Sequence, residues 1–191
     1  MDKRDLKQLL SDVAGGSVTP ADALTRIQTA PTADLGFAQL DLSRGVRQGA
    51  GEVVYGAGKT AEQIAAIIEA LRDAGQERIL VTRLDAEKAA RTSELLDNGI
   101  DLGYVPDAQL ALVGGKPSPT GNGRIVVACA GTSDLPVAEE AALTAEFYGN
   151  EVDRLYDVGV AGLHRLLAHA EELAQAQVVI AIAGMEGALA S

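Results

Sequence analysis

Residues 124–134, RIVVACAGTSD, decide the fold of this chain. Residues 125–130 are all apolar and lack the alternation of a half-buried strand, so a strand here is buried on both faces, as in a parallel sheet. Gly131 then breaks the strand, and Thr132, Ser133 and Asp134 introduce a helix. A buried strand that turns at once into a helix is the start of a βαβ unit, so the sequence predicts an α/β protein.

The same rhythm continues to the end of the chain. Strands are predicted at 151–158 and 177–183, and helices at 134–148, 161–174 and from 184 onward. These elements predict a three-layer, parallel-sheet (flavodoxin-like) domain. Three strands are fewer than the ~4–6 of an ordinary sheet, and the last helix has barely begun. We therefore expect this domain to be incomplete at its C-terminus, with either a second chain or further sequence completing the sheet.

Upstream of this domain the chain predicts another α/β region, covering residues 1–113. Residues 114–123, GGKPSPTGNG, separate the two regions as a linker rich in Gly and Pro. The region at 124–191 is then the start of a second domain. Within the first region, helices are expected over 2–30, 61–74 and 85–97, and strands over 36–42, 52–55, 78–84 and within 100–113.

Composition limits the function classes. A formal net charge of −11 repels phosphate backbones and disfavours nucleic-acid binding, although a local pocket can still hold a mononucleotide or dinucleotide. The single cysteine allows no internal disulfide. The N-terminal residues lack the apolar core of a secretion signal, and no apolar run approaches the ~18 residues of a membrane span. These features predict a cytoplasmic protein without membrane contact.

The predicted strand ends carry the candidate site, because open α/β sheets bind ligands at the carboxyl ends of their strands. After the first strand, Thr132 and Ser133 suit a phosphate and Asp134 suits ribose hydroxyls. It is equally consistent with the sequence that Ser133 or Asp134 simply caps the helix. After the second strand, Arg165 can pair with phosphate beside His164, although both residues are also ordinary for a helix surface.

After the third strand, Glu186 lies among small residues and is a candidate acid or base, or else a carboxylate favoured by a helix dipole. By contrast, Cys129 lies inside the first strand and is expected to pack in the core. The GAGKT segment at 56–60 is not a Walker A loop, because Val53 stands where that motif requires Gly. No His or Cys spacing indicates zinc.

Four motifs occur in order: residues 40–64, then AGTSD, then DVGVAGLHRLL at 157–167, then AGMEGALAS at 183–191. Over roughly 36–191 the chain resembles the LarB family of pyridinium-3,5-biscarboxylic acid mononucleotide synthases, which begin nickel-pincer nucleotide synthesis. It is more distantly similar to the aminoimidazole ribonucleotide mutase of purine synthesis. It departs from that mutase at Thr132, around His164, and at Glu186, where the mutase has its catalytic histidine.

The LarB resemblance implies a reaction. The substrates would be nicotinic acid adenine dinucleotide and carbon dioxide, with a cysteine thiolate adding to the pyridinium ring and Glu186 moving a proton. Hydrolysis of the phosphoanhydride would release AMP, helped by Mg²⁺ and without ATP. The family's nucleophilic cysteine corresponds to a position beyond Ser191, so the resemblance implies that this chain alone is inactive.

The resemblance also implies a homo-oligomer. It further implies a role for four residues of the N-terminal motif: Asp41, Arg44, Arg47 and Lys59. The alternative is that these four residues form only surface ion pairs. Two other functions stay open on the sequence alone. One is a mutase-like enzyme acting on a purine ribonucleotide, and the other is a nucleotide-binding protein without catalytic activity.

Overall fold

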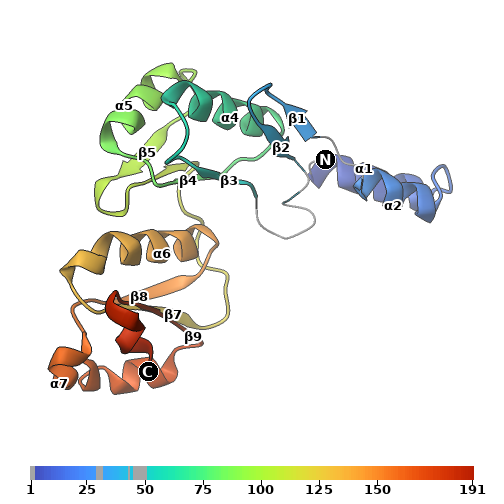
Figure 1. The fold of residues 1–191 in the computed structure, drawn as a ribbon. Helices are drawn as coiled ribbons and strands as arrows, with labels where there is room; N and C mark the ends of the chain where they lie inside the picture. Colours follow the sequence, from blue (N-terminus) through green and yellow to red (C-terminus); the bar gives the residue numbers. More distant parts are fainter. Residues whose placement is uncertain (1–2, 29–31, 43, 45–50) are drawn as a thin grey trace.

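A computed structural model describes residues 3–28, 32–42, 44 and 51–191, and it contains an N-terminal helical hairpin and two α/β units (Figure 1). The hairpin is formed by α1 (Lys3–Ala14) and α2 (Pro20–Gln28). Thr19 starts α2, because its hydroxyl oxygen accepts the amide of Asp22 at 3.1 Å. The hairpin projects from the side of the first unit (Figure 1). Within the described residues, no helix has the length and apolar character needed to cross a membrane.

The first unit is built on a four-stranded mixed sheet with the order β3-β4-β6-β5. β3 and β4 are parallel, whereas β6 runs antiparallel to both β4 and β5. Helices α4 and α5 cover one face, where Ile64, Ile68 and Leu71 of α4 are buried. A small antiparallel hairpin of β1 and β2 adds Leu40 to the same core. The elements are β1 (Thr32–Asp34), β2 (Gln39–Asp41), β3 (Val53–Tyr55), α4 (Ala61–Asp73), β4 (Ile79–Thr82), α5 (Ala86–Leu95), β5 (Leu102–Val105), η1 (Pro106–Ala108) and β6 (Leu110–Val113).

The second unit is a three-stranded parallel sheet with the order β8-β7-β9. Helix α6 packs on one face, and residues of α7, α8 and η4 pack on the other. The predicted α/β class is therefore confirmed, and so is the parallel pairing of the strands around residues 124–130 and 177–183. The elements are β7 (Arg124–Cys129), η2 (Thr132–Asp134), α6 (Leu135–Phe147), β8 (Glu151–Leu155), η3 (Val160–Gly162), α7 (Leu163–Leu167), α8 (Ala170–Gln175), β9 (Val178–Ile182) and η4 (Met185–Ala190).

Helix α6 joins the two units because it is apolar on two sides. Ala138 and Ala142 pack on the β7 sheet. Leu143 and Phe147 instead enter a cluster on the first sheet that contains Leu110. In Figure 1, α6 lies between the two sheets. A helix with apolar residues on two sides needs two partners, so α6 fixes how the units sit on each other.

Two predicted helices differ from the structure. The helix expected over 161–174 is divided into α7 and α8, and His169 begins the second helix with its ring Nδ1 2.7 Å from Glu172. The expected helix after residue 184 is a set of 3₁₀ turns, broken where Glu186 and Gly187 adopt left-handed backbone angles. The low helix propensity of Gly explains the second difference.

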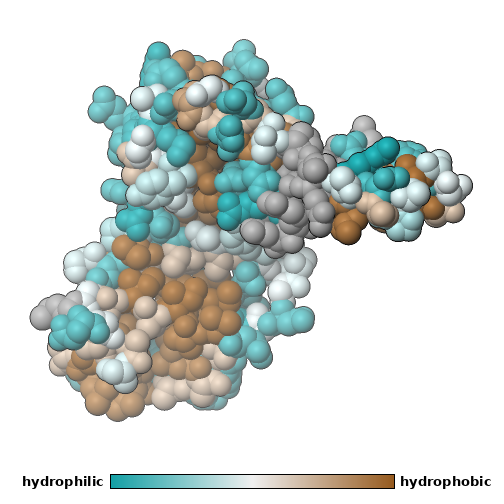
Figure 2. Space-filling model, turned by 45° about the vertical axis from the view of Figure 1, so that its right-hand side comes forward, coloured by the Kyte–Doolittle hydropathy of each residue, from teal (hydrophilic) through white to brown (hydrophobic). Residues whose placement is uncertain are grey.

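The strand β9 is much more exposed than β7. Val126 and Val127 of β7 are buried, but Val178 and Val179 of β9 are 49% and 46% exposed. β9 forms one edge of the sheet and no further described strand pairs with it, but β8 forms the other edge and is less exposed. Figure 2 shows apolar side chains gathered on one face of this unit.

Candidate functional site

The carboxyl ends of β7, β8 and β9 bring three loops together. The amide of Ala130 donates to Ile182 at the end of β9, and the amide of Gly159 in the loop after β8 donates to Ala130, both at 3.0 Å. Gly159 is required at this contact, because a Cβ there would lie only 2.7 Å from the carbonyl oxygen of Ala130. The turn after β7 therefore lies between the other two loops, as expected for parallel strands.

In the turn after β7, Asp134 stabilises its own loop. Its Oδ2 accepts the amide of Gly131 at 3.1 Å. Its Oδ1 faces the next loop, since a Cβ on Gly184 would lie 3.9 Å from it. Thr132 and Ser133 are exposed, and in the described part of the chain their hydroxyls make no hydrogen bond. The turn thus presents the hydroxyls of Thr132 and Ser133 beside the carboxylate of Asp134, of which one oxygen already accepts a backbone amide.

The loop after β8 places Arg165 against a carboxylate that the sequence did not single out. The Nη1 of Arg165 donates to Oδ2 of Asp157. The guanidinium also lies directly over Gly162, where a Cβ would be 2.7 Å from Nε. His164 is exposed. In the sequence, Asp157 falls within the strand predicted at 151–158, whereas β8 ends at Leu155 and leaves Asp157 in the loop.

Glu186, in the loop after β9, is exposed to solvent. The strand before it, β9, is itself half-exposed, so Glu186 does not sit above a buried strand. Glu186 has a φ of 54°, and Asp157 and Arg83 also have positive φ just after strands β8 and β4. Non-Gly residues in this backbone region persist where surrounding contacts hold them, and they cluster at functional sites. Gln109 is the fourth described non-Gly residue with positive φ, so two of the four belong to the loops at the strand ends.

Cys129 lies beneath this site but is closed off from it. Its side chain is fully buried in β7, so the prediction of core packing is confirmed. Burial raises the pKa of the thiol, and the carboxylates of Asp134 and Asp157 act in the same direction. A buried, protonated thiol is a poor nucleophile, so Cys129 is not the source of a catalytic thiolate.

The N-terminal motif residues lie apart from the strand ends. Arg44 forms an ion pair of 3.3 Å with Glu52, and Lys59 donates from Nζ to the carbonyl of Tyr55 at 3.0 Å. Asp41 ends β2, whereas Arg47 lies outside the described residues.

Tyr148 shows where this motif lies relative to α6. Burial raises the pKa of Tyr148, and the charges of Arg44 and Glu52 also act on it. Tyr148 follows the last residue of α6, whereas Asp134 precedes its first. Thirteen helical residues span roughly 20 Å, so Arg44 and Asp134 lie near opposite ends of α6 within one chain.

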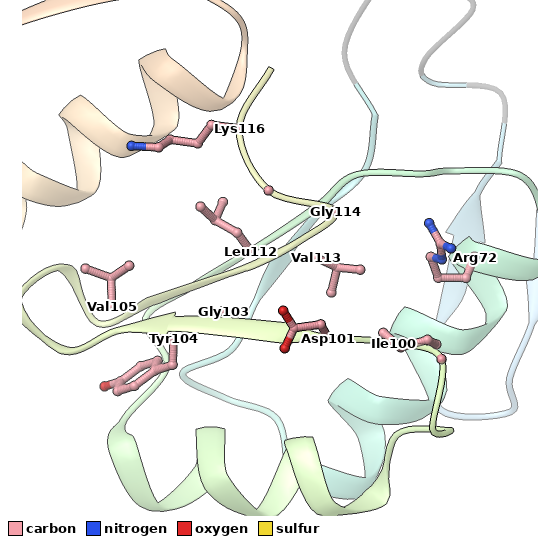
Figure 3. A pocket seen from close by; sticks show the side chains of 12 residues that line it. Arg72, Ile100, Asp101, Gly103, Tyr104, Val105, Leu112, Val113, Gly114 and Lys116 are labelled. Carbon is pink, nitrogen blue, oxygen red and sulfur yellow. The ribbon is translucent and has the colours of Figure 1, made fainter. Parts of the chain in front are cut away.

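A cavity of about 470 Å³ lies elsewhere, beside β5, β6 and the start of the linker (Figure 3). Its charged lining comes from Arg72, Asp101 and Lys116. Both cations are already engaged, Arg72 with the carbonyl of Glu77 at 2.9 Å and Lys116 with Glu146 at 2.7 Å. None of the predicted site residues lines this cavity, so it is separate from the strand-end site.

The comparisons with known proteins agree with the fold. Residues 32–114 match the LarB/PurE-like N-terminal domain. The chain is also 35% identical over 157 residues to the uncharacterised protein MJ0165 of Methanocaldococcus jannaschii, a match that covers 80% of this chain and 61% of that protein. The family match covers the first α/β unit and ends before the strand-end loops. Residues 32–114 thus carry a LarB/PurE-like N-terminal domain.

Proposed function

We propose that the protein carboxylates the pyridinium ring of nicotinic acid adenine dinucleotide and hydrolyses its phosphoanhydride. The products are pyridinium-3,5-biscarboxylic acid mononucleotide and AMP, the first step of nickel-pincer nucleotide synthesis. The observation that carries the proposal is the convergence of three strand-end loops, which together present hydroxyls, a guanidinium and carboxylates at one edge. The match of residues 32–114 to the LarB/PurE-like N-terminal domain supports the choice of reaction.

In this proposal, different loops bind different parts of the substrate. The hydroxyls of Thr132 and Ser133 donate to phosphate oxygens together with Arg165, a cation suited to phosphate. Asp134 accepts from ribose hydroxyls through Oδ1, because Oδ2 already accepts the amide of Gly131. His164 lies next to Arg165 and is exposed, so it contacts the same end of the substrate.

The ring needs an added electron pair before it can attack carbon dioxide. A thiolate forms a C–S bond to the ring and makes carbon 5 nucleophilic. Carbon 5 then bonds to carbon dioxide, a base removes its proton, and the C–S electron pair leaves with sulfur, which restores the aromatic ring. Glu186 is the proposed base, since it is the carboxylate of the loop after β9 and is free in solvent to reach the ring. The thiolate must come from a cysteine other than Cys129, which is buried, so this chain by itself is expected to be inactive.

The hydrolytic step adds water across the phosphoanhydride. Mg²⁺ is expected to neutralise phosphate charge there, and ATP is not required. Among the described residues, no three His, Cys, Asp or Glu side chains are placed together to hold a metal. No step assigned to this chain therefore runs through a metal, and Mg²⁺ remains an expectation that rests on the substrate's own phosphates.

We also propose a homo-oligomer. Arg44 and Asp134 lie near opposite ends of α6. If both groups act on one substrate, they are most simply supplied by different copies of the chain. Light scattering of the complete protein tests this arrangement, and a monomer at micromolar concentration would contradict it.

Product analysis tests the reaction. The complete protein, incubated with ¹³C-bicarbonate and nicotinic acid adenine dinucleotide, is expected to yield AMP and a labelled dicarboxylated mononucleotide by mass spectrometry. Glu186→Gln is expected to slow the carboxylation ~10²–10⁴-fold while substrate binding survives. Near-normal turnover by this variant would remove Glu186 from the mechanism. Turnover of aminoimidazole ribonucleotide instead would favour a mutase-like enzyme.

A further inference from the structure

Arg165 is held in place by two neighbours. Its Nη1 donates to the carboxylate of Asp157, eight residues earlier. Its guanidinium also lies across Gly162, so closely that a Cβ there would be 2.7 Å from Nε and 3.2 Å from Nη2. The side chain therefore folds back along its own loop toward the end of β8. An arginine that served only as a helix-surface residue would need neither contact.

The backbone supports the same reading. Asp157 has a φ of 58°, in the left-handed region that favours Gly. Asp enters this region more readily than most residues, and residues held there are frequent at functional sites. Gly162 has no such reason to be Gly, since its φ of −127° suits any residue. What Gly162 provides is space for the guanidinium.

We propose that Asp157 and Gly162 are positioning residues for the substrate phosphate, acting through Arg165. This inference rests on the proposed function, which assigns Arg165 to that phosphate. A guanidinium has five N–H donors, and the pair with Asp157 uses only one Nη. The side chain of Arg165 remains 38% exposed, so other donors face solvent above the strand ends. Fixing a long side chain before binding removes the entropy cost of ordering it in the complex.

The first test measures the position of Arg165 without any ligand. In the 191-residue chain, the Nη1–H resonance of Arg165, whose protons donate to Asp157, is expected to exchange slowly in nuclear magnetic resonance spectra at low temperature. It should broaden or shift toward the exposed-arginine range in Asp157→Asn and in Gly162→Ala. An unchanged resonance in both variants would overturn the positioning role, whatever the protein binds.

The second test measures binding by calorimetry with nicotinic acid adenine dinucleotide and with inorganic pyrophosphate as probes. Arg165→Ala is expected to weaken the affinity for each probe roughly tenfold or more. Gly162→Ala and Asp157→Asn should each weaken both affinities severalfold. In an Arg165→Ala background, Gly162→Ala should have no further effect, because it acts only through that side chain. Leu167→Ala, an exposed change on the same helix, is the matched control and should leave both affinities unchanged.

The outcomes separate the two claims. If Arg165→Ala leaves both affinities unchanged, the phosphate assignment in the proposed function is wrong. If Arg165→Ala weakens binding but Gly162→Ala and Asp157→Asn do not, the positioning inference is wrong and the proposed function stands. A further loss from Gly162→Ala in the Arg165→Ala background would show a purely structural effect and would also overturn the inference. Thermal melts confirm that each variant is folded.

Discussion

Replacing Phe147 with Ala is expected to uncouple the two α/β units. Phe147 is 7% exposed and lies in a cluster with Leu80, Leu110 and Leu112 of the first sheet. It also packs edge-on against Tyr148, with ring centroids 5.3 Å apart. Truncating a buried Phe to Ala costs about 3–5 kcal/mol. For a chain of this length, that loss lowers the melting temperature by roughly 6–20 °C.

Differential scanning calorimetry and circular dichroism measure this effect. The wild type is expected to unfold in one transition, because α6 belongs to both cores. Phe147→Ala should lower the first melting temperature and split the transition, since the units lose their shared contact. Val137→Ala, at a 42% exposed position on the same helix, is the control and should change stability by about 0.5 kcal/mol or less. Equal effects of the two variants would refute the role of α6 as the joint between units.

Three further predictions concern single groups. Thr92→Val is expected to raise the free energy of unfolding by about 1 kcal/mol in chemical denaturation. The reason is that the hydroxyl of Thr92 is fully buried and has no hydrogen-bond partner among the described residues. A lower free energy of unfolding in the variant would contradict this description. Burial pushes the pKa of Glu146 up, but hydrogen bonds from Arg154 and Lys116 outweigh it and lower the pKa below 4.5. Glu146→Gln should therefore lower the free energy of unfolding by about 1–3 kcal/mol at pH 7. In urea titrations, the difference in free energy of unfolding between wild type and variant should vanish as the pH falls well below 4.5. A difference that stays constant with pH would refute this link between the Glu146 charge and stability. Cys129 should react with iodoacetamide only slowly in the folded protein at pH 8 and rapidly in urea, because burial raises its pKa; fast native labelling would reopen it as a nucleophile.

Local sequence patterns predicted most of the elements. The apolar run of 125–130 gave a buried parallel strand, because only such strands lack alternation. The helix expected over 61–74 from its apolar spacing and from Gly75 is α4, and the structure adds Thr60 as its N-cap. These features depend on residues close together in sequence.

Contacts between distant residues were not predictable in the same way. The two-sided role of α6 depends on Leu143 and Phe147 meeting a sheet formed more than 30 residues earlier. The antiparallel course of β6 between β4 and β5 breaks the βαβ rhythm that the sequence suggested for that region. The exposure of β9 was not predicted, because its apolar run is the same as that of a buried strand.

The candidate site was predicted in outline only. The convergence of three loops follows from parallel strands, but the sequence did not reveal that Asp134 accepts the amide of Gly131. It also missed Asp157, since an acidic residue after a strand has no distinctive pattern until Arg165 is seen against it.

The central claim is that the carboxyl edge of the β8-β7-β9 sheet binds nicotinic acid adenine dinucleotide. Titrating the ¹⁵N-labelled 191-residue chain with this dinucleotide and following the amide resonances tests it most directly. The account predicts saturable shifts in the loops at 131–134, 157–165 and 184–187, with little change near Arg72 and Asp101. Shifts confined to the cavity beside β5 and β6, or none at saturating ligand, would contradict it.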